Sequence, residues 1–190
     1  MVDTSKFFSN IQKHIVLNDA EKNYLTSILE VKEVLRKELI LKQGQQCKKI
    51  YFVVSGSLRA FHINNEGKDS TIMFAIQDWW ITDMYCFINQ KPALVAIEAL
   101  ENCQLIGLDF SSLEELYIKI PKFERFFRIL FQNAYSREQL RALDHISYTT
   151  EERYYRFVHK YPEIVQKITQ KQIASYLGVT PEFLSAIKNK

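Results

Sequence analysis

The chain has 190 residues, of which 47% are hydrophobic and 13% aromatic, and its formal net charge is only +3. This composition can build a packed core and argues against disorder. No apolar run approaches the roughly 20 residues that a membrane-spanning helix needs. The first six residues lack the basic and then apolar pattern of a signal peptide. We therefore expect a cytoplasmic protein of one large domain or two small ones, with no membrane partner.

The cysteines and histidines give no pattern of a metal site. Cys47, Cys86 and Cys103 are odd in number and far apart, and no C-x-x-C pair is present. Neither a zinc site nor an iron–sulfur cluster is therefore indicated. The sequence also lacks a P-loop and a paired-carboxylate motif, so an enzyme ranks only third among the functional hypotheses. We expect no metal and no cofactor.

Residues 1–33 have the pattern of helices. Asn18 is expected to cap one of them, and Glu21 completes a capping box three residues later. The apolar stripe of this helix consists of Tyr24, Leu25, Ile28 and Leu29.

Residues 34–110 change to the period of two that is typical of strands. Glycines punctuate the runs, and turns are expected at Ser55-Gly56 and at 64–67, because glycine and asparagine tolerate positive φ. Many short strands at this spacing indicate a sandwich or roll. Later strands are expected at 70–75, 93–100 and 104–108.

A long helix is expected to begin at Pro121 and to run towards Ser147, after a short helix that Ser111 or Ser112 caps. About 25 residues make a helix of roughly 37 Å, which is longer than a small sandwich needs. Its surplus apolar face favours pairing with a second copy of the same helix. The alternative is a core helix that lies across both domains. The expected dimerisation residues are Phe123, Phe127, Leu130 and Ala134.

Residues 168–188 have the pattern of a helix-turn-helix. Thr169 is expected to cap the first helix, Gly178 to end it in a left-handed conformation, and Thr180 to cap the second. The two apolar faces consist of Ile173, Ala174 and Leu177, and of Phe183, Leu184 and Ile187. An ordinary helical hairpin is the alternative interpretation of this spacing.

The excess positive charge lies at the same end of the chain. Residues 148–190, which include another helix expected at 151–163, hold seven Lys or Arg and four Asp or Glu. The remaining residues hold 18 of each sign. This bias is typical of a surface that faces phosphates. We expect double-stranded DNA as the partner, contacted by Thr169, Gln170, Lys171, Thr180, Glu182, Ser185 and Lys188.

The order of elements resembles the CRP/FNR (catabolite activator) family of transcription regulators, in a branch typical of Bacteroidetes. The similarity covers nearly the whole chain and rests on 41–45, 51–59, 97–103, 152–154 and 173–180. It implies an α+β fold with an N-terminal double-stranded β-helix, a jelly-roll-like cyclic-nucleotide-binding roll with flanking helices. The implied parts are this roll at 1–120, a long dimerisation helix at 121–147 and a helix-turn-helix DNA-binding domain at 148–190.

The ligand cassette that the resemblance implies departs from the family pattern. Ligand-binding members carry a Gly-Glu pair and later an Arg that neutralises the cyclic phosphate. Ala93 and Leu94 stand near the place of that Arg, and neither can form charge-assisted hydrogen bonds to a phosphate. We expect cyclic AMP binding to be lost or very weak. The degenerate cassette consists of Trp80, Thr82, Asp83, Met84, Lys91, Ala93 and Leu94.

The aromatic residues of this region leave two interpretations open. Trp79, Trp80 and Tyr85 could line a pocket for an apolar or aromatic effector, or they simply fill the roll.

The expected reading helix also departs from the best-known members, because Pro181 and Ala186 replace arginines that contact bases. Each missing bidentate Arg–guanine contact removes about 1–3 kcal/mol of discrimination. The leading hypothesis is a homodimeric regulator that binds a palindromic operator, with RNA polymerase as a further partner that the resemblance implies. The alternative is a sensor of a cyclic nucleotide or other small ligand, or an interaction protein, in which DNA binding is weak or lost.

Overall fold

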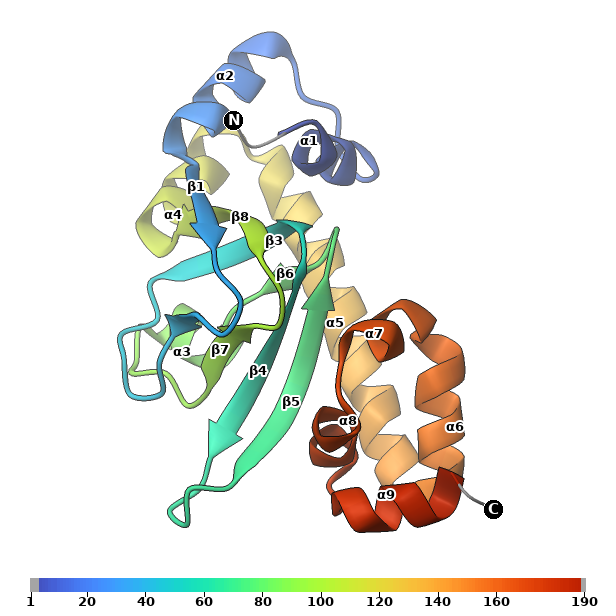
Figure 1. Ribbon diagram of the computed structural model, residues 1–190. Helices are drawn as coiled ribbons and strands as arrows, with labels where there is room; N and C mark the ends of the chain where they lie inside the picture. The colour runs from blue at the N-terminus through green and yellow to red at the C-terminus, as the bar shows by residue number, and fades with distance from the viewer. Residues whose placement is uncertain (1–3, 189–190) are drawn as a thin grey trace.

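The computed structural model describes residues 4–188 (Figure 1). Two helices come first, α1 (Ser5–Gln12) and α2 (Asp19–Ile28). The predicted capping box is confirmed, since Asn18 Oδ1 accepts from the Glu21 backbone N–H at 2.9 Å. In return Glu21 Oε2 accepts from the Asn18 N–H at 2.8 Å. The expectation of helix up to residue 33 is wrong, because Glu30 already begins a strand that pairs with the end of the roll.

The roll consists of two four-stranded antiparallel sheets, and this confirms the predicted α+β class. The strand orders are β1-β8-β3-β6 and β2-β7-β4-β5. Alternating apolar side chains from both sheets fill the space between them. The strands are β1 (Glu30–Val34), β2 (Leu39–Leu41), β3 (Lys49–Ser55), β4 (Ser57–Ile63), β5 (Asp69–Ile76), β6 (Trp80–Ile81), β7 (Ala96–Ala99) and β8 (Cys103–Asp109).

The remaining described helices are α3 (Met84–Asn89), α4 (Phe110–Lys119), α5 (Lys122–Ser147), α6 (Thr150–Lys160), α7 (Pro162–Lys167), α8 (Gln170–Leu177) and α9 (Pro181–Lys188). The start of α4 differs from the prediction, because it follows Asp109 directly and Ser111 and Ser112 lie inside the helix. The helix expected at 151–163 is in fact two, since Tyr161 leaves the helical region before Pro162. No described helix is both long and apolar enough to cross a membrane.

An aromatic cluster holds α5 to the roll. The Trp80 ring lies 5.8 Å from Phe7, 5.4 Å from Phe52, 6.0 Å from Phe126 and 5.5 Å from Phe127, measured between ring centroids. Tilted and edge-to-face pairs of this kind add about 0.5–1.5 kcal/mol each to the free energy of burial. Trp80 is therefore a core residue, which agrees with the interpretation that the aromatic residues of this region fill the roll.

The prediction that Phe123 and Phe127 form a dimer surface is wrong. Their exposed fractions are 1% and 2%, because both point into the core of the same chain. Leu130 and Ala134 are half-buried and line a cavity on the inward side of α5. The apolar side chains that α5 presents to solvent are instead Tyr135, Leu140, Leu143 and Ile146.

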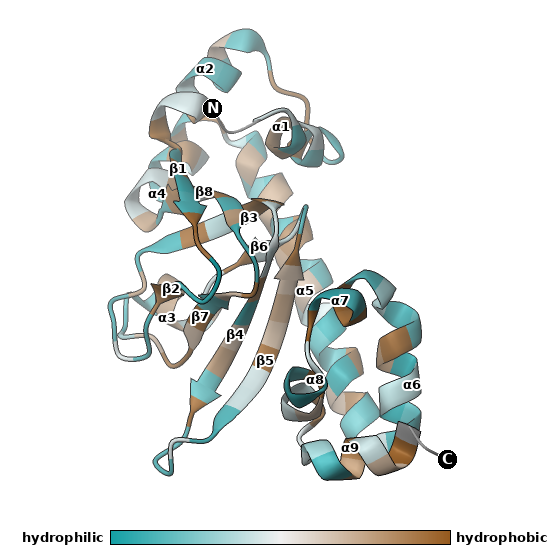
Figure 2. Cartoon of the chain, in the orientation of Figure 1, coloured by the Kyte–Doolittle hydropathy of each residue, from teal (hydrophilic) through white to brown (hydrophobic). Residues whose placement is uncertain are grey.

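The C-terminal helices pack against β5 of the roll, and α8 lies beside this strand (Figure 1). Phe74 of β5 enters their hydrophobic cluster, 5.5 Å from the Tyr176 ring and 6.3 Å from the Phe157 ring. Ser175 Oγ accepts from the Thr71 backbone N–H at 2.9 Å. The turn between β4 and β5, by contrast, is hydrophilic and extends beyond the sheet (Figure 2).

Gly56 makes the sharp turn from β3 to β4 possible. Its φ is +93°, and a Cβ at this position would lie 2.5 Å from Cys103 Sγ and 2.7 Å from the Asn102 carbonyl oxygen. Gly67 has a similar φ of +78°, but nothing lies within 4 Å of its Cβ position. The first glycine is therefore required for space as well as for conformation, and the second for conformation alone.

Gly56→Ala should lower the free energy of unfolding by about 3 kcal/mol or more. The alanine would be strained at this positive φ, and its Cβ would also clash with neighbouring backbone. Gly67→Ala is the matched control and should cost only about 1–2 kcal/mol. Urea denaturation of the two variants measures the difference. Equal losses would contradict the steric explanation.

Candidate nucleic-acid interface and effector site

Helices α8 and α9 form the helix-turn-helix, and the predicted caps are confirmed. Thr169 Oγ1 accepts from the Gln172 backbone N–H at 3.3 Å and forms a capping box with this residue. Gly178 ends α8 with a φ of +74°. Thr180 Oγ1 accepts from the Phe183 N–H at 3.2 Å and so caps α9. Ala174 is fully buried, which lets the two helices approach closely.

The polar side chains that were predicted to contact DNA lie on the surface of this unit. Thr169 and Thr180 are exposed, although their hydroxyls serve as caps. The other four form no hydrogen bond or ion pair with any described residue, which leaves them available to a partner: Gln170, Lys171, Glu182 and Ser185. Lys188 ends α9, and its side chain lies outside the described part of the chain.

Phe183 does not belong to the buried face of α9, contrary to the prediction. Only Leu184 and Ile187 are buried there, with exposed fractions of 0% and 4%, whereas Phe183 is 52% exposed. It lies beside Glu182 in the first turn of the helix. An exposed aromatic ring next to a carboxylate can make apolar contact with a thymine methyl group in a major groove.

Part of the basic charge of residues 148–190 is used inside the protein. Lys167 pairs with Glu101 of the roll at 2.8 Å, and Arg156 pairs with Asp144 of α5 at 3.1 Å. Lys171 has no acidic partner among the described residues. The charge available for phosphate contacts is therefore smaller than the count of seven basic residues indicates.

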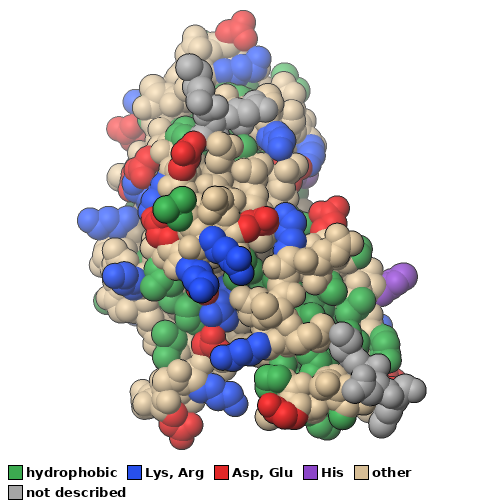
Figure 3. Space-filling model, viewed as in Figure 1, with side chains coloured by type: hydrophobic (Ala, Val, Ile, Leu, Met, Phe, Trp, Pro, Cys, Tyr) green, Lys and Arg blue, Asp and Glu red, His purple; other side chains and the backbone are tan. Residues whose placement is uncertain are grey.

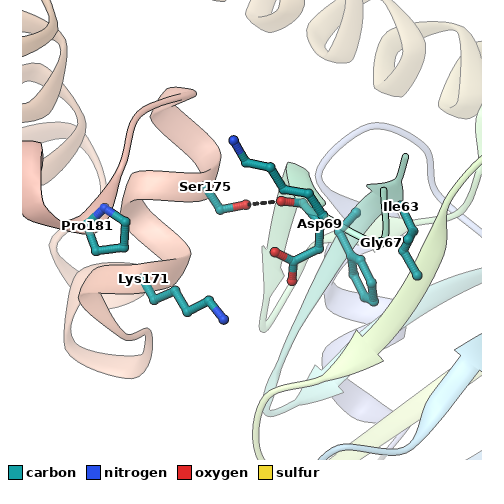
Figure 4. A pocket seen from close by; sticks show the side chains of 8 residues that line it. Ile63, Gly67, Asp69, Lys171, Ser175 and Pro181 are labelled. Carbon is teal, nitrogen blue, oxygen red and sulfur yellow. Dashed lines mark hydrogen bonds between the residues drawn. The ribbon is translucent and has the colours of Figure 1, made fainter. Parts of the chain in front are cut away.

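Lys171 borders a cavity of about 400 Å³ between the β4–β5 turn and the helix-turn-helix (Figure 4). Lys68 of the turn lines the same cavity, so a roll residue and an α8 residue bring two positive charges to one place, next to Asp69, which pairs with Arg59. Ser175 Oγ donates to the Asp69 carbonyl oxygen at 3.2 Å and holds the turn against α8. On the face shown in Figure 3, Lys and Arg side chains gather over the roll and its border with the C-terminal helices. No pattern along the chain indicated Lys68, because it lies more than 100 residues from Lys171.

A second, larger cavity of about 1030 Å³ extends from the roll along α5 to the C-terminal helices. Four of the seven predicted cassette residues line it, namely Trp80, Thr82, Asp83 and Met84. The remaining three lie elsewhere. Ala93 is buried in the roll, Leu94 is 53% exposed, and Lys91 is exposed and donates to the Tyr85 hydroxyl at 3.3 Å.

The carboxylate of the cassette is held by the backbone. Asp83 Oδ2 accepts from the Leu94 N–H at 2.7 Å and from the Val95 N–H at 3.1 Å. Asp83 Oδ1 accepts from the Cys86 N–H at 3.2 Å and caps α3. Thr82 Oγ1 donates to the Lys49 carbonyl oxygen at 2.8 Å. The structure therefore brings no guanidinium or ammonium group to Asp83 among its described residues.

The three cysteines are free, buried thiols. Burial raises the pKa of each, that of Cys103 to about 11, so all three stay protonated near neutral pH. Within residues 4–188, no group of three or more His, Cys, Asp or Glu side chains is arranged to hold a metal ion.

Comparison with known proteins gives matches over most of the chain. The model of the cyclic nucleotide-binding domain family matches residues 31–119. An anaerobic regulatory protein of Haemophilus influenzae is 26% identical over 185 residues, which cover 90% of this chain and 70% of the relative.

Two solved structures share the fold. A CRP/FNR-family regulator from Eubacterium rectale superposes with a TM-score of 0.73 at 20% identity, covering 91% of this chain and 82% of that one. The c-di-GMP-responsive regulator CLP of Xanthomonas campestris also reaches 0.73, at 13% identity and with 90% of each chain covered. The Bacteroidetes-like branch stays a prediction. The chain is therefore similar to the cyclic nucleotide-binding domain family over residues 31–119, to anaerobic regulatory proteins over most of its length, and in fold to a regulator of the CRP/FNR family.

Proposed function

We propose that the protein is a DNA-binding transcription regulator that acts in the cytoplasm as a homodimer. The observation that carries the proposal is the α8–α9 pair, whose turn is capped at both sides. Four of its outer polar side chains have no partner among residues 4–188, namely Gln170, Lys171, Glu182 and Ser185. The regulator relatives, such as the anaerobic regulatory protein of Haemophilus influenzae, support the same role.

The first turn of α9 supplies the contacts to base edges. Glu182 accepts from a cytosine N4 amino group, and Phe183 packs on a thymine methyl group. Thr169, Gln170, Lys171, Thr180 and Ser185 contact phosphates or base edges around them. Pro181 and Ala186 offer no side-chain donor, so specificity is modest and binding depends strongly on phosphate contacts.

The outward face of α5 pairs the two protomers. Tyr135, Leu143 and Ile146 recur at helical spacing, with exposed fractions of 71%, 51% and 83%. Leu143 and Ile146 lie away from the cavity that Leu130 and Ala134 face, whereas Tyr135 lies at the border of this cavity. Two parallel copies of α5 bury these side chains and present two α9 helices to successive major grooves, about 34 Å apart. The operator is then a rough palindrome, and RNA polymerase is the further partner that this role implies.

The cavity favours a second candidate function, that of a small-ligand sensor with weak DNA binding. Its volume of about 1030 Å³ is at the upper end of ordinary ligand sites, and its lining is mainly apolar. The two candidates differ in whether duplex DNA binds at all.

Fluorescence anisotropy with duplex DNA should show binding at low salt that weakens steeply as salt increases. The logarithm of the association constant should fall linearly with the logarithm of the salt concentration, with a slope of about −0.9 per phosphate neutralised. Lys171→Ala should reduce that slope by about 1 per protomer. Lys42→Ala, an exposed lysine in the loop after β2, is the matched control and should leave it unchanged. Absence of binding even at low salt would exclude the regulator and favour the sensor.

Ile146→Glu should dissociate the dimer, since it places a like charge on both copies in an apolar contact. Sedimentation velocity measures the expected shift towards monomer. Glu138, which is exposed on the cavity side of α5, provides the control variant Glu138→Gln. A dimer that persists in Ile146→Glu would place the interface elsewhere.

Titration calorimetry should detect no cyclic AMP binding at micromolar concentrations. The reason is that Ala93 and Leu94 stand near the place of the phosphate-neutralising Arg, while the Asp83 carboxylate has no cation facing it among the described residues and would repel an anionic ligand. A dissociation constant in the micromolar range or below would contradict this expectation.

A further inference from the structure

The loop that follows α3 turns two backbone N–H groups towards one point in the roll. These belong to Leu94 and Val95, and both donate to the same oxygen, Oδ2 of Asp83, at 2.7 and 3.1 Å. The other carboxylate oxygen accepts from the Cys86 N–H at 3.2 Å. Asp83 is only 7% exposed, so these contacts are largely protected from water.

This carboxylate is unusual because no cation balances it. A buried carboxylate is costly unless it is paired or accepts several hydrogen bonds. Asp83 forms no ion pair with any residue that the structure describes. Its carboxylate is therefore held mainly by three backbone N–H groups, and the Cys86 thiol is a further contact. Converging backbone N–H groups with no side-chain cation are also how proteins bind small oxyanions.

We propose that the backbone N–H groups of Leu94 and Val95 form an oxyanion site that the protein fills with its own Asp83 carboxylate. The chemical class that fits the site is a small carboxylate or phosphate. While Asp83 occupies it, an external anion meets donors that are already engaged and a negative charge that repels it.

The self-filled site has a consequence for regulation. In a site that needs an external anion, the loop would be ordered only when that ligand is bound. Here the carboxylate belongs to the chain itself, so the hydrogen bonds from residues 94–95 to Asp83, the N-cap of α3, do not depend on a bound ligand. The roll then keeps one conformation at this point without an anionic effector. This inference concerns the roll alone and does not depend on DNA binding.

The space beside Asp83 allows a replacement ligand to enter. Asp83 lines the cavity of about 1030 Å³ together with Thr82 and Met84. Removing its side chain would therefore open the two N–H groups to a cavity that is much larger than an acetate or phosphate ion.

Chemical rescue tests the proposal in the full-length protein. Asp83→Ala should lower the thermal midpoint by about 5–10 °C in sodium chloride, because three hydrogen bonds to a charged group are lost. Sodium acetate or inorganic phosphate at the same ionic strength should restore part of the loss in a saturable manner. The wild-type protein should show no such anion-specific increase.

Two variants serve as controls. Asp109→Ala also removes a carboxylate before a helix, but the Asp109 side chain caps no N–H group, so no anion should rescue it. Asp83→Asn keeps the side chain in the site and loses the charge, so it should be destabilised and not rescued.

Equal behaviour of Asp83→Ala in acetate, phosphate and chloride would overturn the proposal, as would equal rescue of Asp83→Asn. If Asp83→Ala does not fold in chloride, refolding is attempted in acetate and in phosphate. Recovery of the folded protein in either anion supports the site, and failure in both overturns it. Loss of DNA binding in any variant is read separately and bears only on the proposed function.

Discussion

The packing of Trp80 against rings from α1, β3 and α5 is the contact on which the arrangement of the whole chain depends. α5 leaves the roll at Phe126 and Phe127, whose rings lie within 6.0 Å of the Trp80 ring. The direction of α5 in turn determines where α6 to α9 can lie, because only Tyr148 and the N-cap Thr149 separate the end of α5 from the start of α6.

Features that depend on neighbouring residues in the chain could be predicted from the sequence. The capping boxes at Asn18 and Thr169 and the left-handed Gly178 follow from local hydrogen-bonding chemistry, which the spacing of side chains reveals. The alternation of strands and helices was predictable for the same reason. The order of these elements was enough to indicate the resemblance to CRP/FNR regulators before any contact between them was known.

Features that depend on tertiary contacts could not be predicted in this way. The apolar residues of α5 cover more than one face, and periodicity alone does not tell which face the roll covers, so Phe127 was assigned to the wrong one. Phe183 looked like a core residue because it is apolar and adjacent to Leu184, but only the packing of α9 shows that its side chain is 52% exposed. The donors to Asp83 Oδ2 are the backbone N–H groups of residues 94 and 95. A pattern of side chains in the sequence cannot reveal backbone donors.

The position of Phe74 means that the roll and the C-terminal helices are not independent structural units. Its ring comes from β5 but completes the hydrophobic cluster around Phe157 and Tyr176. Detached from the roll, the C-terminal helices would expose that cluster to water. The roll would therefore still be needed without any effector, because β5 supplies part of the hydrophobic cluster on which the fold of the helix-turn-helix depends.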